Sequence, residues 1–488
     1  MKTMKSIRIL YLFSGIALLL AGCKKITDFN NDPNTLPVDK ATPQLLFPSA
    51  VMSTAGHIHG EYAITGGLWA QYYTQSALAS QYRTLDAFNV NTTDMNLAYR
   101  ESYIGALNDY VKAQELATAE GNWKFNLMAT VMKAYTLQVL ADLYDMVPYS
   151  EAFKGQANLQ PKFDDGYSIY KGLLAEIDAA LAKDYKSGTL SSADAKADVV
   201  FNGSMDNWER FANTLKLKMY LRMVNAKPAE AEAGVKALYT ANAKFLETTA
   251  GVDIFKDEPN FSNPFFEQNI RKLNTTTNLR ASETFVSWLR ANNDPRIVAY
   301  FGSTNPGTIH QGDFTSTNPA YGAAAVFVQH ATDPVYFISE AESYFMQAEA
   351  RERYYGGAGA KALYDAGVTA AFEQHGLAPG ALLTGAYAYP VAGTFQQKLE
   401  AIIVQKWASF PGSHDLEGWF EKNRTGYPRT SPVYSTSASY VPGQLVYPKN
   451  GVTNGLFPKR LLFPDIERSR NSNTPAEVPI TVKTWWGL

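Results

Sequence analysis

The stretch Phe125-Asn-Leu-Met-Ala-Thr-Val-Met-Lys-Ala-Tyr-Thr-Leu-Gln-Val-Leu-Ala-Asp-Leu-Tyr144 is the clearest helical segment of this 488-residue chain. Its apolar residues recur at steps of three and four, which is the spacing of one helix face: Leu127, Met128, Val131, Met132, Tyr135, Val139 and Leu143. Pro148 follows, and because proline cannot continue a helix we expect it to stop this one.

Similar patterns lie on both sides of this segment. Further helices are expected at 99–119, 167–183, 282–291, 337–354, 360–375 and 394–410. Asp206 and Glu209 resemble a capping box at the start of another helix, and Pro228 can begin the helix after that one. Several helices pair with roughly the spacing of TPR repeats, although the consensus TPR residues are absent. The expected fold class is mainly α, with TPR-like helix-turn-helix pairs.

Helical periodicity fails in three long segments, 252–279, 301–335 and 428–464. Pro, Gly, Asn, Ser and Thr dominate them, yet they are also too aromatic to be simple linkers. Long loops in a compact protein usually have a task. We therefore expect an irregular, long-loop lobe beside the helices.

The N-terminus has the three-part layout of a secretory leader. Lys2, Lys5 and Arg8 precede an apolar run at 9–21, which is shorter than the roughly 20 residues that a membrane-spanning helix needs. Leu20-Ala-Gly-Cys23 resembles a bacterial lipobox, in which cleavage leaves the cysteine as the acylated N-terminus. We predict a signal peptide at 1–22, lipidation (palmitate-type acylation) of Cys23, and a flexible tether at 23–42.

Composition excludes some partners. The net charge is −2, from 44 basic and 46 acidic residues, and no basic stripe stands out, so nucleic acid is not an expected partner. Cys23 is the only cysteine, so its acylation would leave no free thiol and no disulfide. Aromatic residues make up 13% of the chain. Such rings can bind sugars or proteins, or simply fill a large helical core.

A cluster of aromatic and amide side chains is the candidate ligand site. Its members are Trp69, Tyr72, Tyr73, Gln75 and Tyr82, with Gln71 and Gln81 nearby. On a helix, the first three rings would share one side, where they could stack on sugar faces while the amides meet hydroxyl groups. The alternative is an aromatic stripe packed into the core. Phe301, His310, Tyr321 and Phe327 form a weaker candidate set.

Acidic residues between 340 and 352 raise the possibility of a glycosidase. Glu349 and Glu352 could form a carboxylate pair for glycoside cleavage. On a helix, however, Glu349 and Arg353 are an i,i+4 ion pair, and a solvated helix face is the simpler interpretation. The chain has no metalloprotease helix, P-loop, EF-hand loop or nucleophile elbow, so no cofactor, metal site or catalytic residue is predicted.

An ordered set of motifs extends over nearly the whole chain after Cys23. The motifs are DPN (32–34), DLYDMVPYSEA (142–152), NLRASETFVSWL (278–289), DPR (294–296), AESYFMQAEA (341–350), IVQKWASF (403–410), LEGWFEKNRTGYP (416–428), PKRLLFPDIE (458–467) and NSN (471–473). Together with the lipobox, this set resembles the SusD/RagB family of nutrient-binding outer-membrane lipoproteins, in its SusD-like branch. Asn423 is a departure, because relatives often carry a second arginine before Arg424.

The resemblance implies a single large, mostly helical domain at 43–488 with TPR-like helix pairs and an irregular lobe. It also implies a non-catalytic surface lipoprotein, held in the outer membrane by its lipid anchor and facing the cell exterior. Such a protein acts as a lid on a TonB-dependent, SusC-like transporter, to which it delivers a nutrient oligomer, usually a glycan. Peptides or another small oligomer are alternative cargo. The shared motifs read as scaffold: Ser282 can cap a helix, and Gly426 can end one.

The Cys23→Ala variant separates anchoring from recognition. Because the thiol is the predicted attachment atom, we expect the variant to be released from membranes while it stays folded and binds ligand. Uptake of the nutrient by cells should then be lost, which fractionation and a growth assay would measure. A variant that fails to fold would contradict a purely positional role for Cys23.

Overall fold

The computed structural model describes residues 40–412 and 414–488, so Cys23 and the predicted leader lie outside the described residues. Residues Pro43–Leu488 form one unit. Within this part of the chain, no helix combines the length and the apolar character needed to cross a membrane.

The apolar segment that was expected to form a helix at 125–144 forms α7 (Trp123–Tyr144). The Asn122 side chain caps its start by accepting a hydrogen bond from the Phe125 N–H at 3.3 Å. Every residue from Leu127 to Tyr144 is buried, so α7 is covered on all sides by other elements. The helix ends before Pro148, because Asp145 leaves helical geometry with a φ of 71° and Met146–Pro148 forms strand β2.

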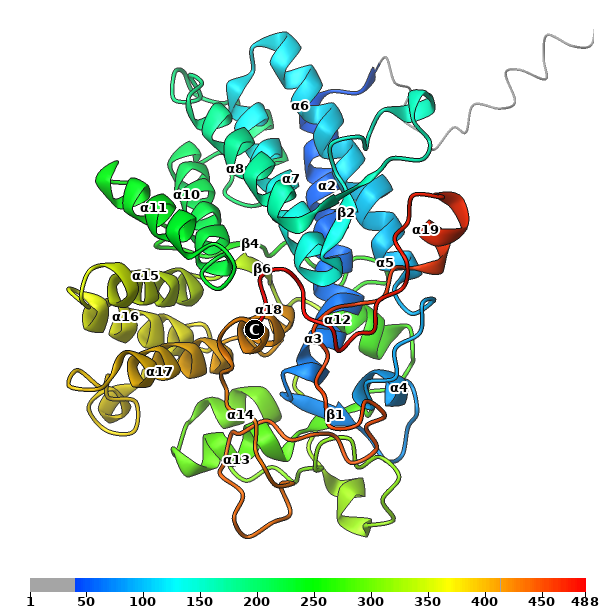
Figure 1. The fold of residues 1–488 in the computed structure, drawn as a ribbon, viewed down its shortest axis with the longest axis vertical. Coiled ribbons are helices and arrows are strands. Elements are labelled where there is room, and N and C mark those ends of the chain that lie inside the picture. Colours follow the sequence, from blue (N-terminus) through cyan, green and yellow to red (C-terminus); the bar gives the residue numbers. More distant parts are fainter. Residues whose placement is uncertain (1–39, 413) are drawn as a thin grey trace, which may run out of the picture. The chain divides into compact units, whose positions relative to one another are not determined.

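Paired helices form most of the unit, as Figure 1 shows. The N-terminal half contains α2 (Pro43–His57), the π-helical turn η3 (Ile58–Tyr62), α3 (Ala63–Trp69), α4 (Arg83–Asp86), α5 (Asn96–Glu101), the π-helical turn η4 (Ser102–Leu107), α6 (Asn108–Glu120), α8 (Gly166–Leu181), α9 (Ser192–Ala197), α10 (Met205–Arg222) and α11 (Pro228–Thr240). Helix α7 packs between α6 and α8, and α10 packs on α11. These pairs confirm the mainly α fold with TPR-like pairing.

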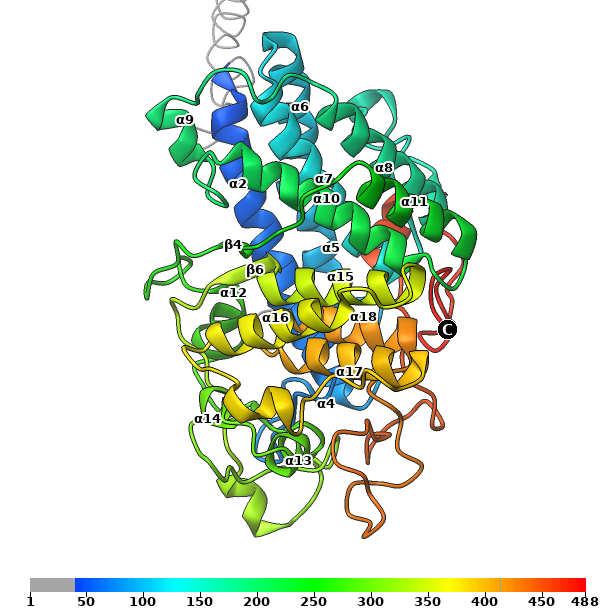
Figure 2. The same cartoon turned by 90° about the vertical axis from the view of Figure 1, so that its left-hand side faces the viewer.

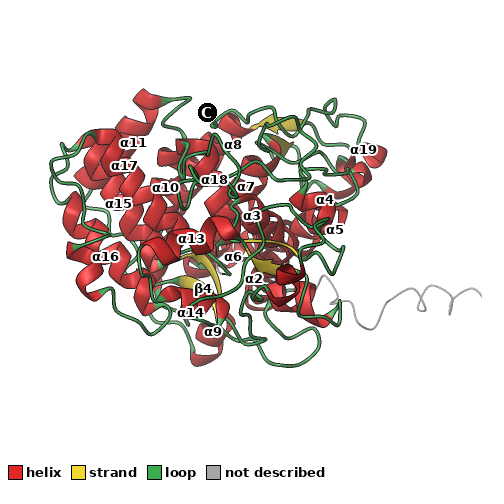
Figure 3. Ribbon diagram, turned by 90° about the horizontal axis from the view of Figure 1, so that it is seen from below, coloured by secondary structure: helices red, strands yellow, loops and turns green. Residues whose placement is uncertain are grey.

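The second half continues this pattern. It contains α12 (Pro264–Phe266), the π-helical turn η6 (Glu267–Arg271), α13 (Glu283–Ala291), α14 (Arg296–Phe301), α15 (Glu340–Tyr354), α16 (Ala360–Glu373), α17 (Phe395–Ala408), α18 (Asp415–Thr425) and α19 (Asp465–Arg470). Short 3₁₀ turns at η5 (Gly155–Ala157), η7 (Pro319–Ala323) and η8 (Gly380–Thr384) lie between helices in the Pro43–Leu488 unit. Helix α15 packs on both α16 and α17, and the three lie side by side in Figures 1 and 2. Long irregular segments connect the remaining elements, as expected (Figure 3).

Three short antiparallel strand pairs join distant parts of the chain. Strand β1 (Tyr73–Gln75) pairs with β5 (Leu279–Ala281), and β2 pairs with β3 (Phe163–Asp165). Strand β4 (Ala250–Val252) pairs with β6 (Val335–Ile338). Strand β6 corrects the helix expected at 337–354, which begins instead at Glu340 because Ser339 caps it by accepting from the Glu342 N–H at 3.1 Å.

The helix ends follow local chemistry in most places. Pro228 is at the first position of α11, Ser282 caps α13, and Gly426 ends α18 with a φ of 82°, as the sequence predicted. The expected capping box at Asp206 and Glu209 is wrong. Ser204 caps α10 instead, by accepting from the Asn207 N–H at 3.4 Å, and Glu209 pairs with Lys186.

A buried ion cluster lies where α7, α10, α15, α17 and α18 meet. It contains five cationic groups and five carboxylates: Lys218, Arg222, Arg353, Lys406 and Arg424 with Asp142, Glu342, Glu349, Glu417 and Glu421. Glu342 and Glu349 are 0% and 1% exposed. The solvated face expected for α15 is therefore wrong, although the Glu349–Arg353 pair is present at 2.7 Å.

Two arginines make the closest contacts of this cluster. The Arg222 Nε donates to Asp142 Oδ2 at 2.9 Å, and its Nη2 donates to Glu417 Oε1 at 2.6 Å. The Arg424 Nη1 and Nη2 donate to the two carboxylate oxygens of Glu349, both at 2.6 Å. Lys218 adds ion pairs to Glu342 at 3.0 Å and to Glu417 at 2.9 Å. The cluster thus connects four helices through charged hydrogen bonds and adds α17 through the ion pairs of Lys406.

Removal of one buried partner should be costly. Arg424→Met would leave Glu349 and Glu421 without their arginine in the interior, so we expect the free energy of unfolding to fall by about 3–5 kcal/mol. Arg429→Met is the matched control, because it breaks an exposed Arg–Glu pair of the same bidentate geometry and should cost about 0–1 kcal/mol. Urea unfolding measures both, and equal losses would contradict a structural role for the buried cluster.

Candidate functional site

The structure places most of the predicted ligand residues in the core. Trp69, Tyr72, Tyr73 and Gln75 are at most 1% exposed. Helix α3 ends at Trp69, and Tyr73–Gln75 forms β1, so the three rings do not share a helix face. This corrects the geometry on which the stacking prediction rested, because none of these four side chains offers an open face to a sugar. Their positions are those of the alternative, an aromatic stripe packed into the core.

Hydrogen bonds hold these side chains in place. The Trp69 Nε1 donates to the Leu85 carbonyl at 2.9 Å, and the Tyr72 hydroxyl donates to the Trp407 carbonyl at 2.8 Å. The Tyr73 hydroxyl donates to Asp415 Oδ1 at 2.8 Å. The polar end of each ring is therefore satisfied inside the protein, as buried tyrosine and tryptophan require.

Tyr82 has a different setting from the other four. It is 7% exposed and lines a cavity of about 350 Å³ together with Gln81. Its backbone N–H donates to Gln75 Oε1 at 2.6 Å, which connects it to the buried part of the predicted set. A ligand contact of Tyr82 stays a prediction. In the weaker set, Phe301 and Phe327 are core residues, while the His310 ring lies against Tyr321 and Tyr434.

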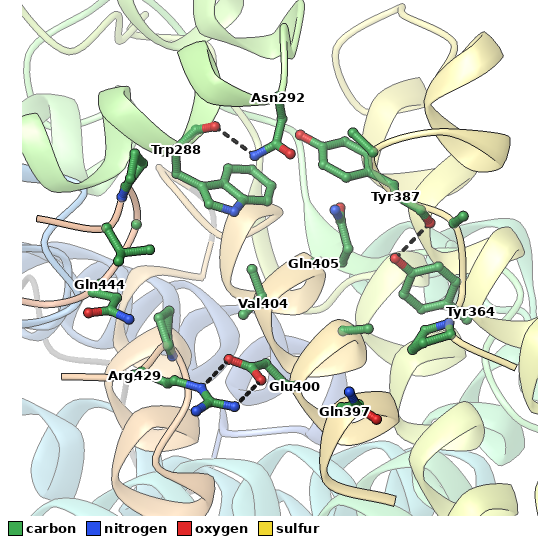
Figure 4. Close-up of a pocket in the computed structure, with 18 residues that line it drawn as sticks. Trp288, Asn292, Tyr364, Tyr387, Gln397, Glu400, Val404, Gln405, Arg429 and Gln444 are labelled. Carbon is green, nitrogen blue, oxygen red and sulfur yellow. Dashed lines mark hydrogen bonds and ion pairs between the residues drawn. The ribbon is translucent and has the colours of Figure 1, made fainter. Parts of the chain in front are cut away.

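A second hollow has the composition expected of a ligand site. The α13–α17 cleft, shown in Figure 4, has a volume of about 370 Å³. Its walls come from α13, α16, α17, the segment 386–390, and the loop segments 428–429 and 441–444. Its lining includes Trp288, Asn292, Tyr364, Tyr387, Gln397, Glu400, Val404, Gln405, Arg429, Val441, Gly443 and Gln444.

Two stacked rings form one side of the cleft. The planes of Trp288 and Tyr387 are 7° from parallel, and their centroids are 5.4 Å apart. The Tyr387 hydroxyl donates to the buried Asp294 at 2.6 Å, and its carbonyl accepts from the Tyr364 hydroxyl at 3.0 Å. Gly443 runs close to the indole, where a Cβ would come within 2.6 Å of Trp288 Cδ1, and its φ is +83°. The loop therefore requires glycine at this position.

Amide groups supply most of the polar lining. The Asn292 Nδ2 donates to the Trp288 carbonyl at 2.8 Å, and the Gln397 Oε1 accepts from the Thr394 N–H at 2.8 Å. The Gln405 Oε1 accepts from Arg296 at 3.4 Å. Each of these contacts uses only part of an amide's hydrogen-bonding capacity. Figure 4 shows these amides around the floor that Val404 forms.

The charges in the cleft are paired with each other. Arg429 and Glu400 form two parallel hydrogen bonds, Nε to Oε1 and Nη2 to Oε2, both at 2.6 Å (Figure 4). Because the Arg429 side chain is 56% exposed, water screens this pair and it contributes little to stability. A cleft with flat rings, amides and a self-neutralised ion pair suits a neutral, polar, ring-shaped ligand. Within the described ranges, no group of three or more His, Cys, Asp or Glu side chains could hold a metal ion.

Sequence reasoning missed this cleft for a physical reason. Trp288 lies in a motif that we interpreted as scaffold. The motif is part of the scaffold, because its helix buries Phe285 and Leu289, and it is also part of the site, because the Trp288 indole lines the cleft. The other walls come from segments up to 156 positions away, and no local pattern connects them. The only available indication was the length and aromatic content of the 428–464 segment.

Comparisons with known proteins agree with the fold. A SusD-like family model, described as starch-binding and associating with the outer membrane, matches residues 33–448. The chain belongs to the SusD-like family. The resemblance drawn from the ordered motifs is thus confirmed. Among curated proteins no match was found.

Solved structures of SusD homologues are similar over most of this SusD-like chain. One from Bacteroides uniformis has a TM-score of 0.74 at 21% identity, and covers 91% of this chain and 99% of its own. A chitin-binding SusD homologue from Flavobacterium johnsoniae has a TM-score of 0.74 at 20% identity, with coverage of 91% and 98%. A further chitin-binding protein has a TM-score of 0.71 at 23% identity, with coverage of 91% and 99%. At these identities the likeness establishes the fold.

Asp415, the buried carboxyl partner of Tyr73, should make the stability of the SusD-like unit depend measurably on pH. Burial raises the pKa of Asp415 to about 7, against the opposing effect of hydrogen bonds from the Gly412 N–H and the Tyr73 hydroxyl. A carboxyl with a raised folded-state pKa stabilises the fold below its unfolded pKa, and this contribution is lost as the pH rises through about 7.

Asp415→Asn tests this, because asparagine is neutral at every pH. The wild type loses the stabilisation by the protonated carboxyl as the pH rises, whereas the variant does not. We therefore expect the unfolding free energy of the variant minus that of the wild type to rise by about 2 kcal/mol between pH 5 and pH 8. Urea unfolding at the two pH values measures the change. The effect of the other buried carboxyl groups is the same in both proteins, so it cancels in the difference between the two unfolding free energies. A difference that stays constant with pH would contradict the raised pKa.

Proposed function

We propose that this protein is a cell-surface lipoprotein that captures a nutrient oligomer, most of all a glycan, in the α13–α17 cleft. In this proposal it acts as a lid that delivers the ligand to a TonB-dependent, SusC-like transporter in the outer membrane. The observation that carries the proposal is the cleft itself, in which stacked rings and amides line about 370 Å³. Family membership supports it through the family's description as starch-binding and outer-membrane associated.

The ligand class follows from the lining. Sugar rings offer apolar faces that suit Trp288 and Tyr387, and hydroxyl groups that suit Asn292, Gln405 and Gln444. Because Glu400 neutralises Arg429, the cleft has no unpaired charge among these residues to attract a charged ligand. Two similar structures are of chitin-binding proteins, so N-acetylated sugars belong in the first panel of ligands.

The anchor and the partner complete the proposal. The lipobox predicts attachment through Cys23, and the tether at 23–42 would let the folded unit move while it stays on the membrane. The helix pairs would face the transporter barrel and the long loops would face the ligand. The uptake assay with Cys23→Ala tests this delivery role.

Catalysis is the less favoured alternative. A glycosidase needs a carboxylic acid with a raised pKa beside a second free carboxylate. Although burial alone would raise it, Arg424 and Arg353 hold the pKa of Glu349 below its usual value. Glu352 accepts hydrogen bonds from the Tyr389 hydroxyl at 2.6 Å and from Lys398 at 3.3 Å. Both carboxylates therefore have structural partners.

Loss of the indole should weaken binding. We expect Trp288→Ala to lower the affinity for the bound oligosaccharide about 10-fold, because stacking contributes about 0.5–1.5 kcal/mol beyond area burial. Calorimetry with chito-oligosaccharides, malto-oligosaccharides and short peptides would measure it, starting from micromolar to millimolar affinity. Gln444→Ala is a milder second variant, in case the first is unstable.

Phe261→Ala is the control, because Phe261 is an aromatic residue outside the cleft and is 61% exposed. It should leave affinity unchanged, and thermal unfolding of each variant checks folding. An oligosaccharide whose affinity is insensitive to both cleft variants would show that the site is wrong. Binding of peptides alone would show that the glycan assignment is wrong.

A further inference from the structure

A separate cavity of about 310 Å³ lies beside α14 and the C-terminal end of α16. We name it the α14–α16 cavity. It shares no lining residue with the α13–α17 cleft. Its lining combines aromatic rings, prolines and amides with His330 and Asp333, whose Nδ1 and Oδ1 atoms are 3.2 Å apart. The aromatic, amide and imidazole side chains at its centre are Tyr300, Phe327, Gln329, Tyr336, Gln374 and His375.

The hydrogen bonds of His375 fix which of its ring nitrogens carries the proton. The Tyr300 hydroxyl donates its single proton to the Ala408 carbonyl at 3.0 Å. That hydroxyl must therefore accept from His375 Nε2, which is 3.1 Å away. Burial, with a smaller effect of the nearby Arg296 charge, lowers the pKa of His375 to about 4, so the ring is neutral at pH 7. Its Nδ1 is then a hydrogen-bond acceptor at the cavity.

Gln374 supplies the complementary donor. Its Nε2 is buried and has no hydrogen-bond partner among the residues that the structure describes. A buried donor without a partner is unfavourable, so its presence in a cavity wall calls for an explanation. A hydrogen bond orients the side-chain amide of Gln329, because its Oε1 accepts from Asn269 Nδ2 at 3.1 Å. The Gln329 Nε2 therefore remains a donor.

Aromatic rings complete the lining. The rings of Tyr300 and Phe327 are stacked on each other at 6.3 Å with 21° between their planes and are nearly fully buried, whereas Tyr336 is partly exposed. We propose that the α14–α16 cavity is a second ligand site, which takes one neutral sugar ring beside Tyr336, with Gln374 and His375 meeting its hydroxyl groups. The ligand class rests on the proposed function, whereas the site itself rests on the cavity and its unpartnered donor.

A buried ion pair forms the wall between the two sites. Asp294 and Arg296 are both fully buried and approach to 2.6 Å. On the cleft side, Asp294 accepts from the Tyr387 hydroxyl at 2.6 Å and Arg296 donates to Gln405 at 3.4 Å. On the cavity side, Tyr300 and His375 lie within the field of the Arg296 charge. Because this fixed pair separates them, a side-chain change in one site should leave the other intact.

Gln374→Leu tests the proposal without a foreseeable folding cost, since it removes a donor that has no partner in the described structure. Calorimetry of the full chain with N-acetylglucosamine, glucose and their disaccharides should give two binding events for the wild type. In Gln374→Leu the thermal midpoint should be unchanged or higher, and one of the two affinities should fall by about 3- to 10-fold, as for the loss of one hydrogen bond.

Glu373→Ala is the matched control, because Glu373 is the neighbouring residue at the end of α16 but is exposed and does not line the cavity. It should leave both events unchanged. A combination with Trp288→Ala separates the two hypotheses. If calorimetry shows a single binding event, and Trp288→Ala weakens it while Gln374→Leu leaves it unchanged, the second site is overturned and the cleft remains the capture site.

The converse result would place recognition in the α14–α16 cavity. A single binding event that Gln374→Leu weakens and Trp288→Ala leaves unchanged would support the α14–α16 cavity as a ligand site and contradict the cleft as the capture site. An absence of binding by all of these sugars at millimolar concentration would overturn the second site as a sugar site. A drop in the thermal midpoint of Gln374→Leu would show that its amide already has a structural partner, which would also overturn it.

Discussion

The charged hydrogen bonds of Arg222 and Arg424 hold the arrangement of four helices, and Lys406 adds α17 to them through ion pairs. Arg222 joins α10 to Asp142 on α7 and to Glu417 and Glu421 on α18, while Arg424 joins α18 to Glu349 on α15. Each buried ion loses its hydration, and only a complete set of partners offsets that loss. The cluster therefore tolerates one relative placement of these helices far better than any other, which fixes the geometry on which both ligand sites are built.

The α13–α17 cleft depends on this placement through α17. Lys406 reaches Glu342 and Glu421 in the ion cluster, and its neighbours Val404 and Gln405 line the cleft. Asp294 and Arg296 do not line the cleft themselves, but Asp294 accepts from the Tyr387 hydroxyl and Arg296 donates to the Gln405 amide oxygen. The cleft is thus bounded by residues that two buried charge systems position, so its rings and amides are set before a ligand arrives.

Features that depend on neighbouring residues could be predicted from the sequence, and features that depend on distant partners could not. The periodicity of α7, the Ser282 cap and the Gly426 helix end are local, and the structure has them. The acidic residues of α15 look solvated because their partners, such as Arg424, lie some 75 positions away. Strand β6 exists only because β4 pairs with it. Trp69 and Tyr73 are equally compatible with a core and with a surface until the fold is known.

Trp288 shows how a scaffold helix also serves recognition. Helix α13 buries Phe285 and Leu289, which fixes the direction in which the indole must leave the helix. The residues that complete the cleft, Tyr387 and Gly443, come instead from irregular segments that take no part in the ion cluster. Changes at 441–444 can therefore alter the shape of the cleft without disturbing a buried charge, whereas Tyr387 is tied to the buried Asp294 by the hydrogen bond of its hydroxyl. Ligand preference is free to vary at 441–444, whereas α13 and α17 are constrained by packing.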